Sequence, residues 1–187
     1  MKTRLDLYNN SWYRPGGSPL SRGLWYFVNH LIFNNGLFPF SGFKCTILRL
    51  FGARVGSGVV IKPSVNIKYP WRLEIGNHVW IGEGVWIDNL GQVKIGDHVC
   101  LSQGCLLLCG NHNYRKETFD LMVGDITLEE GVWIGARALL GPGVHAGTHS
   151  VLEAGSVSGK NLEAFTIYRG NPAAIVKKRQ FYGAEGA

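Results

Sequence analysis

The sequence predicts a mainly β protein that is wound as a parallel β-helix, with helices before it and a loop projecting from its side. Aliphatic residues recur every six positions between Val55 and Leu152, and a small or β-branched residue follows four places after most of them. Neither an α-helix nor a simple strand has a period of six, whereas a coil with three six-residue faces does. The 26 glycines supply turn-formers, and 45% hydrophobic residues argue against disorder.

Fourteen hexads align on the aliphatic position. They begin at Val55, Ile61, Ile67, Ile75, Ile81, Ile87, Ile95, Leu101, Leu107, Leu128, Ile134, Leu140, Ala146 and Leu152. Stacked coils of about 18 residues place these side chains in columns that bury one another. Glycine often follows the aliphatic residue, and we expect these glycines to adopt positive φ at tight corners. An ordinary β-sandwich, whose strands alternate with a period of two, does not produce this spacing.

The repeat divides the chain into three regions. Residues 1–54 hold an aromatic-rich stretch that we expect to form a helical and extended cap, because residues 24–40 are too short and too polar for a membrane span. The β-helix occupies residues 55–160, and residues 161–187 form a C-terminal tail. The step from Ile95 to Leu128 exceeds a 20-residue coil by thirteen residues, so a loop near residues 111–125 projects from the wall.

Charge and cysteine usage restrict the partners and the compartment. A net charge of +6 favours acidic partners such as phosphates or anionic membrane surfaces, but the basic residues are too dispersed for a nucleic-acid site. The four cysteines form no CxxC pair, and the first ten residues lack the pattern of a secretory signal, so we expect a cytoplasmic protein with reduced thiols. The apolar stretch and the basic residues that follow it also permit contact with the inner surface of the membrane.

Few side chains in the sequence are suited to chemistry. The six histidines form no metal-binding set, so we expect no metal, and neither a phosphate-binding Walker loop nor a nucleophile elbow is present. His78 and His98 recur at equivalent corners and read as turn residues. His112 differs because it stands where the projecting loop begins, and a neutral imidazole is well suited to take a proton from a hydroxyl. Either Glu117 or Asp120 in the same loop could orient that imidazole.

Several segments resemble a known family. Hexads such as residues 81–86 and 134–139 resemble the hexapeptide-repeat proteins, which are left-handed parallel β-helices and mostly acyltransferases. The segment 110–114 (Gly-Asn-His-Asn-Tyr) is similar to the loop of the maltose, galactoside and polysaccharide O-acetyltransferases, whose histidine is the general base. Together with residues 48–53, 61–65, 69–71 and 169–173, it resembles the acetyltransferases of colanic-acid and exopolysaccharide biosynthesis.

This resemblance implies transfer of an acetyl group from acetyl coenzyme A to a hydroxyl of a sugar or lipid-linked oligosaccharide. It implies that His112 is the catalytic base, that the transfer is direct, and that three chains form a homotrimer with each site between two of them. The acceptor would meet Asp88, Asn89 and Tyr114. The residues implied for coenzyme A are Gly135, Ala136, Ala154, Gly159, Lys160, Arg169 and Lys177.

Two other functions fit the same sequence features. An N-acetyltransferase acting on an amino sugar has similar requirements for a base and a coenzyme. A β-helix that binds a ligand without catalysis would keep the repeat but would not depend on His112. The sequence identifies neither the acceptor sugar nor the hydroxyl that is modified.

Overall fold

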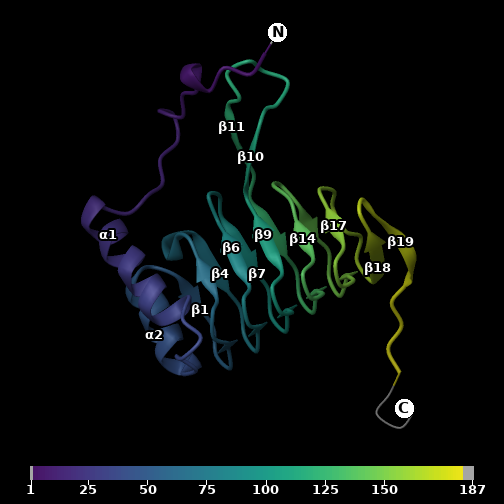
Figure 1. The fold of residues 1–187 in the computed structure, drawn as a ribbon. Coiled ribbons are helices and arrows are strands. Elements are labelled where there is room, and N and C mark those ends of the chain that lie inside the picture. The colour runs from purple at the N-terminus through teal and green to yellow at the C-terminus, as the bar shows by residue number, and fades with distance from the viewer. Residues whose placement is uncertain (1, 183–187) are drawn as a thin grey trace.

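The computed structural model describes residues 2–182, so the last five residues of the expected tail lie outside it. A short helical region comes first, followed by a solenoid of short strands (Figure 1). The helices are η1 (Leu5–Leu7), α1 (Pro19–Val28), the π-helical turn η2 (Asn29–Phe33), α2 (Ser41–Leu50) and, between two strands, η3 (Pro70–Arg72). The predicted mainly β fold with a helical cap and a β-helix is confirmed.

The solenoid has three parallel sheets, which form the three faces of each coil. Sheet A consists of β1 (Arg54–Val55), β4 (Leu73–Ile75), β7 (Val93–Ile95), β12 (Ile126–Leu128) and β15 (His145–Ala146). Sheet B consists of β2 (Val60–Ile61), β5 (Trp80–Ile81), β8 (Cys100–Leu101), β13 (Trp133–Ile134), β16 (Val151–Leu152), β18 (Thr166–Gly170) and β19 (Ala173–Lys178). Sheet C consists of β3 (Asn66–Ile67), β6 (Trp86–Asp88), β9 (Leu106–Leu108), β14 (Leu139–Leu140) and β17 (Val157–Ser158).

The aliphatic columns form as the six-residue period predicts. In sheet B the strands pair in register, so that Ile61, Ile81, Leu101, Ile134 and Leu152 lie above one another, all with no exposed surface. Most of the residues four places after the aliphatic positions are buried as well. Because each coil buries its aliphatic side chains against the coils on either side, no coil has a core of its own.

The glycines after the aliphatic residues have a different cause from the one that the sequence suggested. Their φ values are not positive; instead, a Cβ on Gly96 would lie 2.9 Å from the backbone nitrogen of Glu130, and one on Gly135 would lie 2.4 Å from that of Ala154. These glycines therefore permit the close stacking of coils. The left-handed backbone occurs two residues later, at His78, His98 and equivalent glycines, which confirms the two histidines as turn residues.

The helices close the first end of the solenoid. Trp25 and Phe33 of α1 and η2, and Cys45 and Leu48 of α2, are buried in the same core cluster as the first coils. The indole nitrogen of Trp25 donates a hydrogen bond to the carbonyl of Ile67, at 2.9 Å. This cap covers apolar edges that an open first coil would expose. Within residues 2–182, no helix combines the length and the hydrophobicity that crossing a bilayer requires.

Two hairpins interrupt the regular winding. The loop expected near residues 111–125 is an antiparallel hairpin of β10 (Gly110–His112) and β11 (Leu121–Val123), which projects from the corner between sheets C and A (Figure 1). At the other end, β18 continues sheet B beyond residue 160 by pairing in parallel with β16, and β19 folds back antiparallel onto β18. The turn between them contains a cis peptide bond before Pro172.

If glycine permits the stacking of coils, alanine should destabilise the protein more at a crowded glycine than at an uncrowded one. Gly96→Ala is expected to lower the free energy of unfolding by about 1–3 kcal/mol, because the new Cβ would overlap the backbone of the next coil. Gly141→Ala is the matched control: its Cβ would meet the Cα of Gly159 at 3.4 Å, an ordinary contact, and a change below about 1 kcal/mol is expected. Urea unfolding measures both, and equal losses would contradict the stacking explanation.

Candidate active site

His112 ends strand β10 and is held between two aromatic rings. Its imidazole stacks on the ring of Phe119, with ring centroids 4.5 Å apart and an interplanar angle of 7°. The ring of Tyr8, from the N-terminal segment, lies on it at 5.6 Å and 57°. The imidazole is half-buried. Packing between rings restricts its rotation, which is what a residue that must aim one nitrogen at a reactant requires.

A backbone carbonyl fixes the tautomer of His112. Its Nδ1 lies 2.9 Å from the carbonyl oxygen of Phe119. A carbonyl oxygen can only accept a hydrogen bond, so Nδ1 carries the proton in the neutral ring and Nε2 keeps its lone pair. Phe119 has a φ of 52°, a left-handed conformation that is uncommon outside glycine, at the residue whose carbonyl orients the imidazole. The geometry leaves Nε2 as the basic atom.

Neither carboxylate that the sequence offered orients the imidazole. Asp120 accepts hydrogen bonds from Lys116, at 2.8 Å, and from Thr118, at 2.6 Å, and these bonds hold its pKa below the ordinary value. Glu117 is exposed, and among residues 2–182 no hydrogen bond joins its carboxylate to His112. In the single chain the hairpin turns the Phe119 carbonyl, and neither of these carboxylates, toward Nδ1.

The N-terminal segment completes the surroundings of His112, and no pattern in the sequence predicts this. The backbone nitrogen of Arg4 donates to the carbonyl of Glu117, at 2.8 Å, which ties this segment to the hairpin. Further along, the hydroxyl of Tyr13 donates to the carbonyl of Leu90, at 2.8 Å, and burial raises the pKa of Tyr13 to about 12, so this donor stays protonated. The segment has no repeat that would have predicted these contacts.

Two cavities, each of about 450 Å³, lie on the outside of the first coils. One, which we name the hairpin cavity, is lined by Tyr8, Asn10, Tyr13, Pro15, Lys68, Tyr69, Leu90 and Leu121. Two of these residues contact His112: Leu121 pairs with it across the hairpin, and the ring of Tyr8 packs against its imidazole. The other, the helix cavity, lies between α1 and sheet C, and Lys68 and Tyr69 line both.

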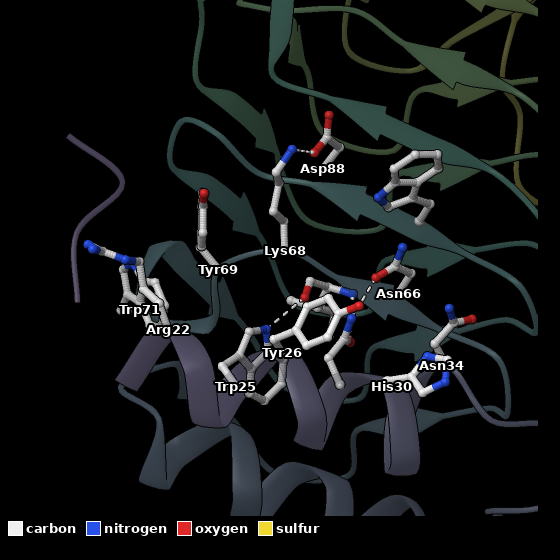
Figure 2. Close-up of a pocket in the computed structure, with 13 residues that line it drawn as sticks. Arg22, Trp25, Tyr26, His30, Asn34, Asn66, Lys68, Tyr69, Trp71 and Asp88 are labelled. Atoms are coloured by element: carbon white, nitrogen blue, oxygen red, sulfur yellow. Dashed lines mark hydrogen bonds and ion pairs between the residues drawn. The ribbon is translucent and has the colours of Figure 1, made fainter. Parts of the chain in front are cut away.

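The helix cavity combines aromatic and polar side chains (Figure 2). Tyr26 and His30 reach it from α1 and η2, and the Lys68–Asp88 ion pair, 2.8 Å long, lies on the wall formed by the solenoid. Trp86, 46% exposed, adds a broad ring surface. Aromatic faces beside hydrogen-bonding groups suit a ligand that has both apolar and hydroxyl-bearing surfaces.

The two adjacent polar residues of the second coil have different positions. Asp88 is largely buried but faces the helix cavity through its ion pair with Lys68. Asn89 is fully buried, and its amide exchanges hydrogen bonds with the backbone of Tyr69, at 2.9 and 2.6 Å. Its side chain therefore holds a bend of the preceding coil, and in the single chain it presents no surface to the acceptor that the resemblance implies.

The residues expected at the coenzyme separate into two groups. Gly135, Ala136 and Ala154 follow strands of sheet B, so they share the corner between sheets B and C. Near them at the end of sheet B, Arg169 forms an ion pair with Glu153, which raises the pKa of the guanidinium and lowers that of the carboxyl. Lys177 on β19 is exposed and pairs in the strand register with Ile167.

The second group shares the corner between sheets C and A, from which the hairpin projects. Gly159 and Lys160 follow β17 of sheet C there, and both are exposed. Tyr114, 73% exposed, lies just past His112 in the hairpin. Within one chain, the structure therefore places His112, Lys160 and Asp88 along one edge of the solenoid, and Gly135 and Ala154 along another. No group of three or more metal-ligating side chains occurs in the part of the chain that the structure describes.

Comparison with known proteins shows which proteins this chain resembles in sequence and in fold. No protein-family model matches the chain. The chain is 36% identical over 164 residues to WcaF of Escherichia coli (strain K12), named as a colanic acid biosynthesis acetyltransferase, with 88% of this chain and 90% of WcaF covered. It is 26% identical over 136 residues to the galactoside O-acetyltransferase of the same organism, covering 71% of this chain and 67% of that protein.

Solved structures have the same fold. A hexapeptide-repeat acetyltransferase from Vibrio cholerae, complexed with acetyl coenzyme A, superposes with a TM-score of 0.78 at 24% identity, covering 87% of this chain and 88% of that one. A maltose O-acetyltransferase from Clostridium difficile 630 gives a TM-score of 0.72 at 22% identity, covering 88% and 90%. With its hexad columns and its identity to WcaF over most of both chains, this chain belongs to the hexapeptide-repeat acetyltransferases.

Proposed function

We propose that this chain transfers an acetyl group from acetyl coenzyme A to a sugar hydroxyl in exopolysaccharide biosynthesis, with His112 as the general base. The observation that carries the proposal is the imidazole itself, whose Nδ1 is held by the Phe119 carbonyl so that Nε2 is free to accept a proton. Acetyl coenzyme A as the donor is supported by the complex of the Vibrio cholerae relative, and a sugar acceptor by the names of WcaF and the galactoside enzyme.

In this mechanism Nε2 of His112 takes the proton of the acceptor hydroxyl while the oxygen attacks the thioester carbonyl. A backbone N–H stabilises the resulting oxyanion. When the carbon–sulfur bond breaks, the imidazolium returns its proton to the sulfur, and coenzyme A leaves as a thiol. No acyl-enzyme forms, which is consistent with the cysteines: burial raises the pKa of Cys105 to about 12 and that of Cys109 to about 11, so both thiols stay protonated.

We further propose that the acceptor enters through the two cavities. Asp88 and its partner Lys68 offer charged hydrogen-bonding groups to hydroxyls in the helix cavity. Lys68 also lines the hairpin cavity, together with Tyr8, whose ring contacts His112. Tyr114, exposed in the hairpin two residues after His112, is proposed as a further acceptor contact. The unpaired state of all four thiols is consistent with the proposed cytoplasmic location.

A homotrimer is part of the proposal, because one chain separates the two halves of the site. His112 and Lys160 lie on the edge between sheets C and A, whereas Gly135 and Ala154 lie on the edge between sheets B and C. A side of the triangular solenoid stands between these edges. A cyclic arrangement brings the first edge of one copy beside the second edge of the next, so each site draws on two chains.

The outer faces of the solenoid support this packing. The side chains that point outward from sheets B and C are mostly apolar, and three tryptophans among them are 42–46% exposed in the single chain: Trp80, Trp86 and Trp133. Sheet A instead presents polar and charged side chains: Arg54, Glu74, Lys94, Thr127 and His145. Sheets B and C are therefore the faces suited to contact with another copy, and sheet A the face suited to solvent.

Replacement of the base tests the proposed role of His112. His112→Ala is expected to lower kcat by ~10²–10⁴, because the hydroxyl would lose its proton acceptor. The assay is release of free coenzyme A thiol from acetyl coenzyme A in the presence of a panel of sugars. His145→Ala is the matched control, since this exposed histidine pairs with Glu129 on sheet A and is expected to keep activity. Equal activity in both variants would remove His112 from the mechanism.

If the Phe119 carbonyl orients His112, replacement of the loop carboxylates is expected to have little effect on kcat. Glu117→Gln and Asp120→Asn are each expected to lower kcat by less than about tenfold, whereas loss of a carboxylate that orients a catalytic histidine costs on the order of 10⁴. The same thiol-release assay measures kcat for both variants, and thermal unfolding checks that the hairpin variants remain folded. A loss of 10³ or more in either folded variant would show that the carboxylate, and not the Phe119 carbonyl, positions the imidazole.

A further inference from the structure

The helical cap has an apolar face that the solenoid does not cover. One side of α1 and η2 packs on the first coils through Trp25 and Phe33. On another side, large apolar residues follow one another at intervals of four, three and four positions, which aligns them in a stripe along the helix axis. They are Leu20 (72% exposed), Leu24 (52%), Phe27 (62%) and Leu31 (61%).

More apolar side chains surround this stripe at the same end of the molecule. Phe43 and Leu50 of α2 are 52% and 79% exposed, and Leu37 and Phe40 in the connection between η2 and α2 are 91% and 64% exposed. Figure 1 places α1 and α2 together at the first end of the solenoid, away from sheets B and C of the later coils. An exposed apolar group of this size on a soluble domain indicates a surface that is covered in function.

The N-terminal part of the sequence, which includes the cap, has an excess of basic residues. Residues 7–73 contain eight Lys and Arg and no Asp or Glu, whereas the other 120 residues contain eleven basic and thirteen acidic residues. The net charge of +8 in the first segment therefore exceeds the +6 of the whole chain. The basic residues are Arg14, Arg22, Lys44, Arg49, Arg54, Lys62, Lys68 and Arg72. Lys44 is buried, and Arg54 and Lys68 form ion pairs with Glu74 and Asp88. The exposed positive charge of the helices themselves therefore comes from Arg22 and Arg49.

We propose that this cap, defined by α1, η2 and α2, is a docking surface for an anionic lipid bilayer. The helix would lie in the plane of the interface, with the stripe from Leu20 to Leu31 between the headgroups and the basic residues near the lipid phosphates. An apolar stripe inside a region without a single acidic residue matches both the acyl and the anionic parts of such a surface. A second copy of the same surface is a poor occupant, because it would bring together two surfaces that carry basic residues and no acidic ones.

Docking would also orient the proposed acceptor site. Tyr26 and His30, on the same helical segment as the stripe, line the helix cavity (Figure 2). A cap lying on the bilayer would hold this cavity close to the headgroups, where a lipid-linked sugar presents its saccharide. This consequence rests on the proposed function, whereas the docking surface itself does not.

Vesicle flotation with the full-length protein tests the docking surface. Wild-type protein is expected to float with vesicles of phosphatidylcholine containing roughly one third phosphatidylglycerol, and at least about tenfold less with phosphatidylcholine alone. Salt at ~0.5 M is expected to weaken the binding by screening. The double variant Leu24→Glu/Phe27→Glu is expected to lose binding at least tenfold. Ile175→Glu, which replaces an apolar residue 56% exposed on β19 at the far end, is the control that keeps it.

Two results would overturn the proposal. One is absence of binding to the anionic vesicles by folded wild-type protein, or equal binding to both kinds of vesicle. The other is a change of oligomeric mass in Leu24→Glu/Phe27→Glu, measured by light scattering, because the stripe would then be an interface between copies of the chain. Thiol release with a soluble acceptor, assayed in the absence of vesicles, separates these results from a failure of the proposed acetyl transfer.

Discussion

Close stacking of the coils is the constraint on which the rest of the structure depends. Each aliphatic residue is buried by its equivalents in neighbouring coils, and the corners approach so closely that a Cβ on Gly96 or Gly135 would overlap the backbone of the next coil. This spacing repeats every coil, so corners that are far apart in sequence lie along straight edges. The hairpin that carries His112, the turn at Lys160 and the ion-paired Asp88 share one edge for this reason.

This edge fixes the position from which the hairpin projects. The β10–β11 hairpin leaves the wall between two paired coils, and the N-terminal segment crosses it, joined by the hydrogen bond from Arg4 to Glu117. Between them, the Phe119 carbonyl and the rings of Phe119 and Tyr8 hold the imidazole of His112. Backbone geometry, and not a buried charge, sets the tautomer in this arrangement. The loop carboxylates remain free to bond within the hairpin, as Asp120 does with Lys116.

The six-residue period of the sequence predicts where residues lie along the solenoid. It does not predict which way a side chain points or what it contacts. A six-residue spacing identifies the columns, the corners and the place of the hairpin, because each follows from counting. Spacing gives the position of a glycine but not its cause, so the glycines after the aliphatic residues were assigned to positive φ instead of to close approach. Asn89 and Asp88 are adjacent and polar, yet only Asp88 faces a cavity. The contact between Tyr8 and His112 joins residues about a hundred positions apart with no shared pattern, so no sequence signal predicted it.

The proposed site requires that one copy of the chain supplies His112 and that the next copy supplies the edge with Ala154. Mixing of two inactive variants tests it: His112→Ala, and Ala154→Trp, which would obstruct the second edge at an exposed corner. When the two are co-expressed with different tags and the mixed trimers are purified, one interface in three combines an intact His112 with an intact Ala154, so about a third of wild-type thiol release is expected. Mixed trimers that remain as inactive as either parent would contradict a site shared between chains.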